Sequence, residues 1–411
     1  MSGLEWTPEQ EELRDAVSAV LARHPGHAAW APLTAQVGAA ALAVPEEYGG
    51  LGCGAAEVGV VMAELGRALS PVPYLGSAVL TVGALLASGD GDACATHLPA
   101  LAEGSLIGAL AWAESPRGGP GRDRGAGAGT TPGAGTGAHG GWEAADMATL
   151  AEPDGDGWLL TGTKQYVLAG PAEPGLVLVF AAMDTAPGRT GATPPGGHDR
   201  HAPGQGNGPA PAHTHGQGSG GLGLFELTAP PAACTARATM DRTRPLGEVT
   251  LARTPARLLS PDGAGVLARV RDLACTALAA EQAGAAARAL ESTVRYAKER
   301  IQFGRPIGSF QAVKHRLADM YAAVEAARSM ALAAAAADAP PLLAAAAKSA
   351  CSQAYSYVAG EMIQLHGGIG ITWEHEAHEF FKRAHGSARL FGSPAAHRAR
   401  IAAELGYADA S

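Results

Sequence analysis

Two short segments in the C-terminal half of the chain combine a cation, amides, an aromatic ring and closely spaced glycines. They are Arg300–Gly304 (Arg-Ile-Gln-Phe-Gly) and Gln364–Gly368 (Gln-Leu-His-Gly-Gly). The guanidinium of Arg300 is always charged and forked, which suits a phosphate group, and glycines let a backbone approach a ligand closely. Together these residue types predict a site for a phosphate-bearing ligand with an aromatic ring system. Taken one at a time, the segments would also suit a helix-end ion pair and a glycine C-cap.

Long helices are the elements that would position both segments. From residue 264 onward, apolar residues recur at helical spacing, and glycines and prolines divide the pattern. Helices are predicted at about 264–301, 309–337, 341–366, 374–387 and 394–405. Their short connections predict a helix bundle, in which the two segments lie at the ends of the first and third of these helices.

The rest of the chain divides into a helical part and a strand-rich part. Near the start, Thr7 can cap a helix, Pro8 suits its first position and Gln10 completes a capping box. Helical patterns, including 58–69 and 78–86, continue to about residue 106. Strands are then predicted at 106–112, 157–160, 175–180, 223–227 and 248–251. We therefore expect an all-α domain over 1–106 and a β domain over 107–259.

Two low-complexity tracts interrupt the expected β domain, at about 117–141 and about 186–221. Both consist mainly of Gly, Pro, Thr and Ala, and such compositions bury too little apolar surface to offset the entropy of ordering the chain. We expect both to be disordered insertions. The second contains His198, His201, His213 and His215. Without a rigid framework for ligands, these histidines do not predict a metal site.

Composition narrows the class of protein. The net charge is −9 and no basic run offsets it, which argues against a nucleic-acid binder. Prolines and an aspartate interrupt the Ala-rich stretch at 330–347, so no membrane span is predicted, and no secretory signal opens the chain. No two of the five cysteines have CxxC spacing, so neither a zinc site nor a disulfide framework is expected. Reduced thiols in the cytoplasm are the expected setting.

Five segments, taken in order along the chain, resemble the acyl-CoA dehydrogenase family. They are Val44–Gly52, Ala109–Glu114, Leu160–Val167, Arg300–Gln311 and Gln364–Gly370. The resemblance implies an α+β, mostly α fold: an N-terminal helical domain (1–106), a middle β domain (107–259) and a C-terminal helix bundle (260–411). It also implies FAD as the cofactor, and a tetramer in which two chains build each flavin site.

In this family, one subunit cradles the flavin ring while its neighbour holds the ADP end. The resemblance assigns the neighbour's part, which we call the clamp, to Arg300, Gln302, Phe303, Gln311, Gln364, Gly367 and Gly368. It assigns the ring cradle to Trp112, Ala113, Tyr166 and Leu168. Ala113 and Leu168 stand where the family usually has threonines, and neither side chain can donate a hydrogen bond. The clamp therefore matches the family better than the cradle does.

The family's catalytic glutamate is missing from its usual place. That base removes the α-proton of an acyl thioester, and Phe391 occupies its position in Leu390–Ser393. Other branches carry the glutamate on the first bundle helix, near Ala274 or Cys275 here. Asp272 and Glu281 are the nearest carboxylates on that helix.

Three functions remain open from these residues. The first is a subunit of a heteromeric FAD-dependent acyl-CoA dehydrogenase, similar to actinobacterial types, which supplies the clamp to a partner subunit that has the glutamate. The second is a self-sufficient homotetramer that uses Asp272 or Glu281 as its base. The third is a non-catalytic or repurposed acyl-binding protein of the same fold. The expected partners are an acyl-CoA or acyl-carrier thioester and an electron-transfer flavoprotein, with no nucleic acid and no membrane.

Overall fold

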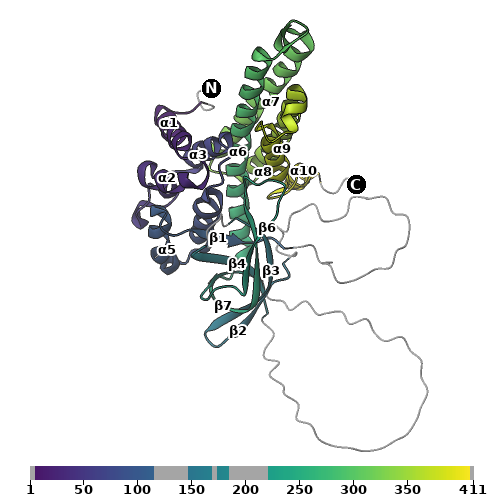
Figure 1. Ribbon diagram of the computed structural model, residues 1–411. Helices are drawn as coiled ribbons and strands as arrows, with labels where there is room; N and C mark the ends of the chain where they lie inside the picture. The colour runs from purple at the N-terminus through teal and green to yellow at the C-terminus, as the bar shows by residue number, and fades with distance from the viewer. Residues whose placement is uncertain (1–4, 115–146, 169–173, 185–220, 408–411) are drawn as a thin grey trace, which may run out of the picture.

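The computed structural model describes residues 5–114, 147–168, 174–184 and 221–407. The expected insertions at 117–141 and 186–221 lie outside the described residues, apart from Gly221. Figure 1 shows helices at both ends of the chain and a β sheet between them, as the sequence predicts.

The N-terminal part is helical throughout. Its α-helices are α1 (Pro8–Arg23), α2 (Trp30–Val37), α3 (Ala55–Arg67), α4 (Val82–Ser88) and α5 (Gly91–Glu103). The capping box that opens α1 is confirmed: Gln10 N donates to Thr7 Oγ1 at 3.3 Å, and Thr7 N donates to Gln10 Oε1 at 3.1 Å. The helix predicted over 78–86 differs, because a π-helix (Leu75–Thr81) precedes α4. Thr81 Oγ1 donates to the carbonyl of Gly76, five residues earlier, which matches the wider π turn.

The middle part forms one seven-stranded sheet. Its strands are β1 (Gly108–Ala111), β2 (Leu150–Asp154), β3 (Gly157–Val167), β4 (Leu176–Met183), β5 (Leu222–Leu227), β6 (Ala233–Arg237) and β7 (Leu246–Ser260). The order is β1-β4-β2-β3-β7-β5, with β6 beside β7, and a further pairing of β4 with β5 closes the sheet on itself. The sequence pattern missed β2 and β6. β2 contains Pro153, and β6 is exposed along its whole length, so it lacks the apolar alternation of a half-buried strand.

The C-terminal part is a helix bundle. It contains α6 (Gly263–Glu299), the short strands β8 (Ile301–Gln302) and β9 (Arg305–Pro306), α7 (Gln311–Ala336), α8 (Pro341–His366), α9 (Ala377–Arg389) and α10 (Pro394–Glu404). All five helices lie within three residues of their predicted bounds. No helix in the described ranges combines the length and hydropathy needed to cross a bilayer.

Helix α6 connects the three parts. It runs from the sheet through the bundle, with the N-terminal helices on one side and α8 to α10 on the other (Figure 1). Glycines allow its close crossing with α3. A Cβ on Gly66 would lie 2.1 Å from the carbonyl oxygen of Glu281, and one on Gly284 would lie 2.1 Å from that of Ala63. The largest hydrophobic core therefore extends over the N-terminal helices, β1, β4 and α6 rather than ending at a domain boundary.

Candidate functional site

The first clamp segment folds as a tight hairpin. β8 and β9 pair through Ile301–Pro306 and Gln302–Arg305, which leaves Phe303 and Gly304 as the two turn residues. Their φ angles are +52° and +76°, as a type I′ hairpin turn requires. Glycine suits this conformation, whereas a phenylalanine in it is strained, and such strain concentrates at functional sites. The turn presents the Phe303 ring to solvent, and the residue is 92% exposed.

The second clamp segment begins where α8 ends. Gly367 has φ +62° and ψ −141°, a conformation that favours glycine, and a short 3-10 turn (Gly367–Ile371) follows. Tyr296 connects the two segments, because its ring stacks on that of His366 with centroids 4.3 Å apart. The Tyr296 hydroxyl also donates to the carbonyl of His366 at 3.3 Å. The structure therefore brings the ends of α6 and α8 together, as the sequence predicts.

The clamp's polar side chains point outward. Arg300, Gln302, Gln364 and Gln311 are all exposed. Within the described part of the chain, none of these four side chains makes a hydrogen bond or an ion pair. A cation and several amides with open donors suit a phosphate-bearing ligand held by another chain. The residues of the clamp thus fit the ADP end of FAD.

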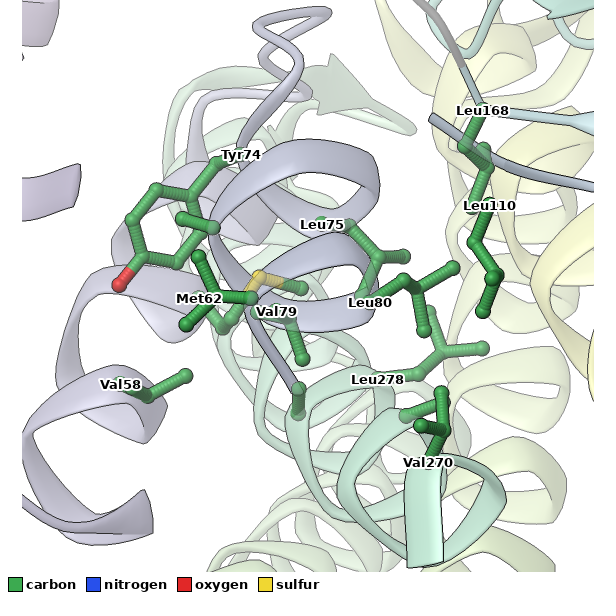
Figure 2. Packing of buried hydrophobic residues seen from close by; sticks show 14 of the residues in the cluster. Val58, Met62, Tyr74, Leu75, Val79, Leu80, Leu110, Leu168, Val270 and Leu278 are labelled. Carbon is green, nitrogen blue, oxygen red and sulfur yellow. The ribbon is translucent and has the colours of Figure 1, made fainter. Parts of the chain in front are cut away.

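The ring-cradle residues, in contrast, are mostly buried. Trp112 and Phe391 are each 1% exposed, and their rings pack with centroids 5.5 Å apart. Leu168 and Leu110 belong to the same hydrophobic cluster as Leu80 (Figure 2). Trp112 and Leu168 therefore lie within the hydrophobic core at the ends of their strands.

The remaining cradle residues differ in exposure. Ala113 is fully buried and pairs with Gln165 in an isolated β-bridge. Tyr166 has φ +56° and is 49% exposed, so it lies outside the closed cluster. Three of the four cradle residues are therefore buried, and Tyr166 is exposed.

The turn that contains Phe391 has a left-handed backbone, with φ +63° at Phe391 and +102° at Gly392. Buried donors hold its two carbonyls. His397 Nε2 lies 2.9 Å from the carbonyl oxygen of Phe391, and Lys348 Nζ donates to that of Gly392 at 3.3 Å. The Cys275 thiol lies against the same turn, 3.9 Å from the Phe391 carbonyl oxygen. The closed position of Phe391 is therefore built into the bundle.

Lys348 is a functional candidate that the sequence reasoning missed. It is fully buried, and in the described structure its ammonium contacts Ser352 Oγ at 2.9 Å and the Gly392 carbonyl, with no carboxylate beside it. Burial lowers its pKa to about 8. Burial likewise lowers the pKa of His397 to about 4, so that ring is neutral. A single lysine inside the Ala-rich predicted helix 341–366 was the available signal.

The two carboxylates considered as bases are held by arginines. Asp272 is 4% exposed and accepts from Arg400 at 2.6 and 3.2 Å. Glu281 is 2% exposed and accepts from Arg244 and from Arg383 Nε, the latter at 3.0 Å. Burial raises the pKa of Glu281, but the two guanidiniums outweigh it, and the pKa lies below its ordinary value. A low pKa makes a carboxylate a poor general base.

A further buried ion pair lies near the ends of β1 and β3. Lys164 Nζ and Glu114 Oε1 are 2.5 Å apart, and Glu114 also accepts from the backbone N–H groups of Ala148 and Thr149. Burial lowers the pKa of Lys164 to about 8 despite the adjacent carboxylate. The pair joins the end of β1 to β3 next to Ala113. No group of His, Cys, Asp or Glu among the described residues is arranged to hold a metal ion, and the four histidines of the second insertion lie outside these residues.

Comparison with known proteins places this geometry in a family. The acyl-CoA dehydrogenase N-terminal domain matches residues 7–105, and the acyl-CoA dehydrogenase C-terminal domain matches residues 263–406. Acyl-CoA dehydrogenase IpdE2 of Mycobacterium tuberculosis is 37% identical over 413 residues, which cover 97% of each chain. The chain therefore belongs to the acyl-CoA dehydrogenase family, whose cofactor is FAD, and the expected fold class is confirmed.

Solved structures agree with the fold. The Tcur3481-Tcur3483 steroid ACAD variant is 28% identical with a TM-score of 0.74, over 98% of this chain and 99% of that one. The ChsE4-ChsE5 complex from Mycobacterium tuberculosis is 26% identical with a TM-score of 0.75, over 98% of both chains. A FAD-dependent dehydrogenase is 25% identical with a TM-score of 0.75, over 98% and 99%.

Proposed function

We propose that this chain is the clamp-supplying subunit of a heteromeric FAD-dependent acyl-CoA dehydrogenase. The observation that carries the proposal is the contrast between the two halves of the flavin site. Phe391 replaces the usual glutamate and is buried against Trp112, whereas the clamp is open with Phe303 92% exposed. Such a chain can complete the flavin site of another subunit with its clamp, while Trp112 and Phe391 occupy its own cradle. Two of the solved neighbours are named as two-protein assemblies, which supports a heteromer.

In this proposal the chain binds and orients, and the partner subunit provides the base. Arg300 would bind the pyrophosphate, Gln302 and Gln364 would offer amide hydrogen bonds, and Phe303 would offer an aromatic face. Gly367 and Gly368 would let the backbone approach the ligand, since nothing lies within 4 Å of a Cβ built on either. FAD, when bound, accepts the hydride that leaves the β-carbon of the acyl thioester.

The substrate, the electron acceptor, the assembly and the cellular location in this proposal follow from membership of the acyl-CoA dehydrogenase family. The substrate is an acyl-CoA or acyl-carrier thioester, and an electron-transfer flavoprotein reoxidises the flavin. The complex is a tetramer and works in the cytoplasm. Residues 1–106, 107–259 and 260–411 are its three domains, which accords with strands beginning at Gly108 and α6 beginning at Gly263.

A self-sufficient homotetramer with Asp272 or Glu281 as base is the competing function. The arginine ion pairs around both carboxylates argue against it, because a base must accept a proton from the substrate. The third function, a non-catalytic acyl-binding protein, predicts no dehydrogenation in any assembly.

Flavin stoichiometry separates the three functions. The chain would be purified alone, and also after co-expression with a family member that carries the glutamate and is encoded by a neighbouring gene. We expect a colourless chain alone and one FAD per two chains in the complex, with bleaching by acyl-CoA. Stoichiometric FAD and bleaching in the chain alone would instead establish the homotetramer. A stable complex that no acyl thioester bleaches would favour the non-catalytic function.

A further inference from the structure

A cavity of about 440 Å³ lies between α1, α3, α6 and α7, and Trp6 borders it. None of its lining residues belongs to the clamp, the cradle or the Phe391 turn. Glycines and alanines form much of its wall, because α3 packs closely against α6 and α7. A Cβ on Gly59 would lie 3.7 Å from that of Ala280 and 3.5 Å from that of Ala335. The volume lies within the range of small-molecule sites.

One buried carboxylate belongs to this wall. Glu64 on α3 is 5% exposed as a residue, and its side chain keeps 7% of its accessible surface. Its single ion pair among the described residues, with Arg67 Nε, spans 3.7 Å, which is longer than a hydrogen bond. Burial raises the pKa of Glu64, and two arginines and the Ser18 hydroxyl only partly offset this effect. The protein's own groups therefore leave this carboxylate undercompensated.

Arg67 pairs mainly with a different carboxylate. Its Nη1 and Nη2 atoms donate to the two oxygens of Glu291 at 3.0 and 2.7 Å. A guanidinium and a carboxylate form their strongest pair in this two-bond arrangement. Glu64 therefore lies beside a cation whose best donors are already used, and a further cation would stabilise it.

The other charges in the wall do not supply that cation. Arg14 donates to Asp15 at 2.8 Å, and Arg328 lies over the Trp6 ring, 5.6 Å from its centroid. The wall as a whole has four carboxylates and three guanidiniums, namely Asp15, Glu64, Glu291 and Glu325 against Arg14, Arg67 and Arg328. One negative charge is left in excess, and Glu64 is the only buried carboxylate of the four.

We infer that this cavity binds an alkylammonium compound, whose charged nitrogen donates to Glu64 and whose hydrocarbon chain contacts the alanines and glycines of α3, α6 and α7. An ammonium group has three donors and no acceptor, so it suits a carboxylate that is short of donors. The excess negative charge disfavours an anion, and a neutral molecule would leave Glu64 uncompensated. The site is separate from the proposed flavin and thioester sites, and it does not depend on the proposed function.

The test compares two probes of matched shape on the purified full chain, hexylamine and 1-hexanol at pH 7 and low salt. Alkyl ammonium groups, like the lysine side chain, are charged at this pH. Dissociation constants would be measured by ligand-observed NMR titration. We expect the amine to bind at least tenfold more tightly than the alcohol, as a charge-assisted hydrogen bond predicts. Equal affinities, or no binding of hexylamine, would overturn the proposal.

A pair of charge variants tests the role of Glu64. Glu64→Gln keeps the side-chain shape and should abolish the preference for the amine. Glu12→Gln makes the same charge change at an exposed position on α1 outside the cavity wall, and it should keep the preference. An equal loss in both variants would show that the amine follows the net charge of the surface, which would contradict the site.

A pair of size variants locates the binding, even if Glu64→Gln does not fold. Glu64 also lines a second cavity, between α1, α3 and α9, to which Ala22 belongs. Ala56→Leu, at a half-buried position in the wall of the 440 Å³ cavity, should weaken both probes by filling the space. Ala22→Leu should leave both affinities unchanged. Binding that survives Ala56→Leu, or that Ala22→Leu removes, would place the probes elsewhere and overturn the proposal.

Discussion

Two phenylalanines in this protein share a backbone conformation and differ in everything else. Phe303 and Phe391 both have left-handed φ angles, +52° and +63°, and each precedes a glycine with positive φ. Phe303 is 92% exposed at the tip of a hairpin, whereas Phe391 is 1% exposed against Trp112. Left-handed phenylalanine is strained in both places. In the proposed function, this contrast means that one half of a flavin site stays open for a neighbour while the other half is closed from within.

The largest expected effect concerns the closed half. Phe391→Ala should lower the free energy of unfolding by about 3–5 kcal/mol, because it leaves a cavity in a packed core. Denaturant unfolding followed by circular dichroism measures this loss. A cost below about 1 kcal/mol would show that Phe391 is a loose cover rather than part of the core.

The next effect tests how the Phe391 turn is held. Lysine in the unfolded chain has a pKa near 10.5, and burial lowers that of Lys348 to about 8. Between these values the native amine has lost its proton while the unfolded chain still binds one. The unfolded state therefore binds more protons, and the free energy of unfolding rises with pH across this window, by up to about 3 kcal/mol.

Lys348→Met should remove this contribution. Stability measured between pH 8 and pH 10 should then rise less steeply than in the unmodified chain. Lys164 contributes a rise of the same sign in both proteins, so the difference isolates Lys348. Lys314→Met, at an exposed position on α7, is the control and should keep the full slope. Identical slopes in all three proteins would mean that Lys348 is not buried as described.

A smaller effect concerns the open half. Arg300→Ala should reduce the FAD affinity of the assembled complex by roughly 10- to 100-fold, as expected for one charge-assisted hydrogen bond of about 1.5–3 kcal/mol. Lys298→Ala is the matched control, because Lys298 is an exposed cation in the last turn of α6, just before Arg300. Flavin fluorescence during dilution measures the affinity. An equal loss in both variants would point to general electrostatics instead of a specific clamp.

The smallest expected change makes the comparison direct. Phe303→Ala should alter the free energy of unfolding by less than about 0.5 kcal/mol, since the ring contacts little of its own chain. The same variant should still weaken FAD retention in the complex. If Phe303→Ala destabilised the isolated chain as much as Phe391→Ala, the distinction between an open and a closed half would fail.

Much of the fold could be predicted because its signals are local. The capping box at Thr7 and the five C-terminal helices follow from neighbouring residues, and the structure confirms them. β6 could not be predicted in this way, because it is exposed and exists only by pairing with β7. The π-helix before α4 was also missed. There Gly76 lies against the carbonyl of Leu168, a contact between distant residues, and a Cβ at Gly76 would come within 1.9 Å of that oxygen.

The sequence by itself determined the family and the phenylalanine at position 391, and it led us to propose the clamp residues, because these depend on residue identity and spacing. Only the tertiary structure decided that Phe391 is closed and Phe303 is open. Exposure depends on contacts between remote segments, such as Cys275 against the Phe391 carbonyl across 116 positions. The same holds for Asp272 and Glu281, whose residue types suggested a base but which the structure pairs with buried arginines. Lys348, which the sequence reasoning missed, stands out only through its burial and its contact with the Gly392 carbonyl.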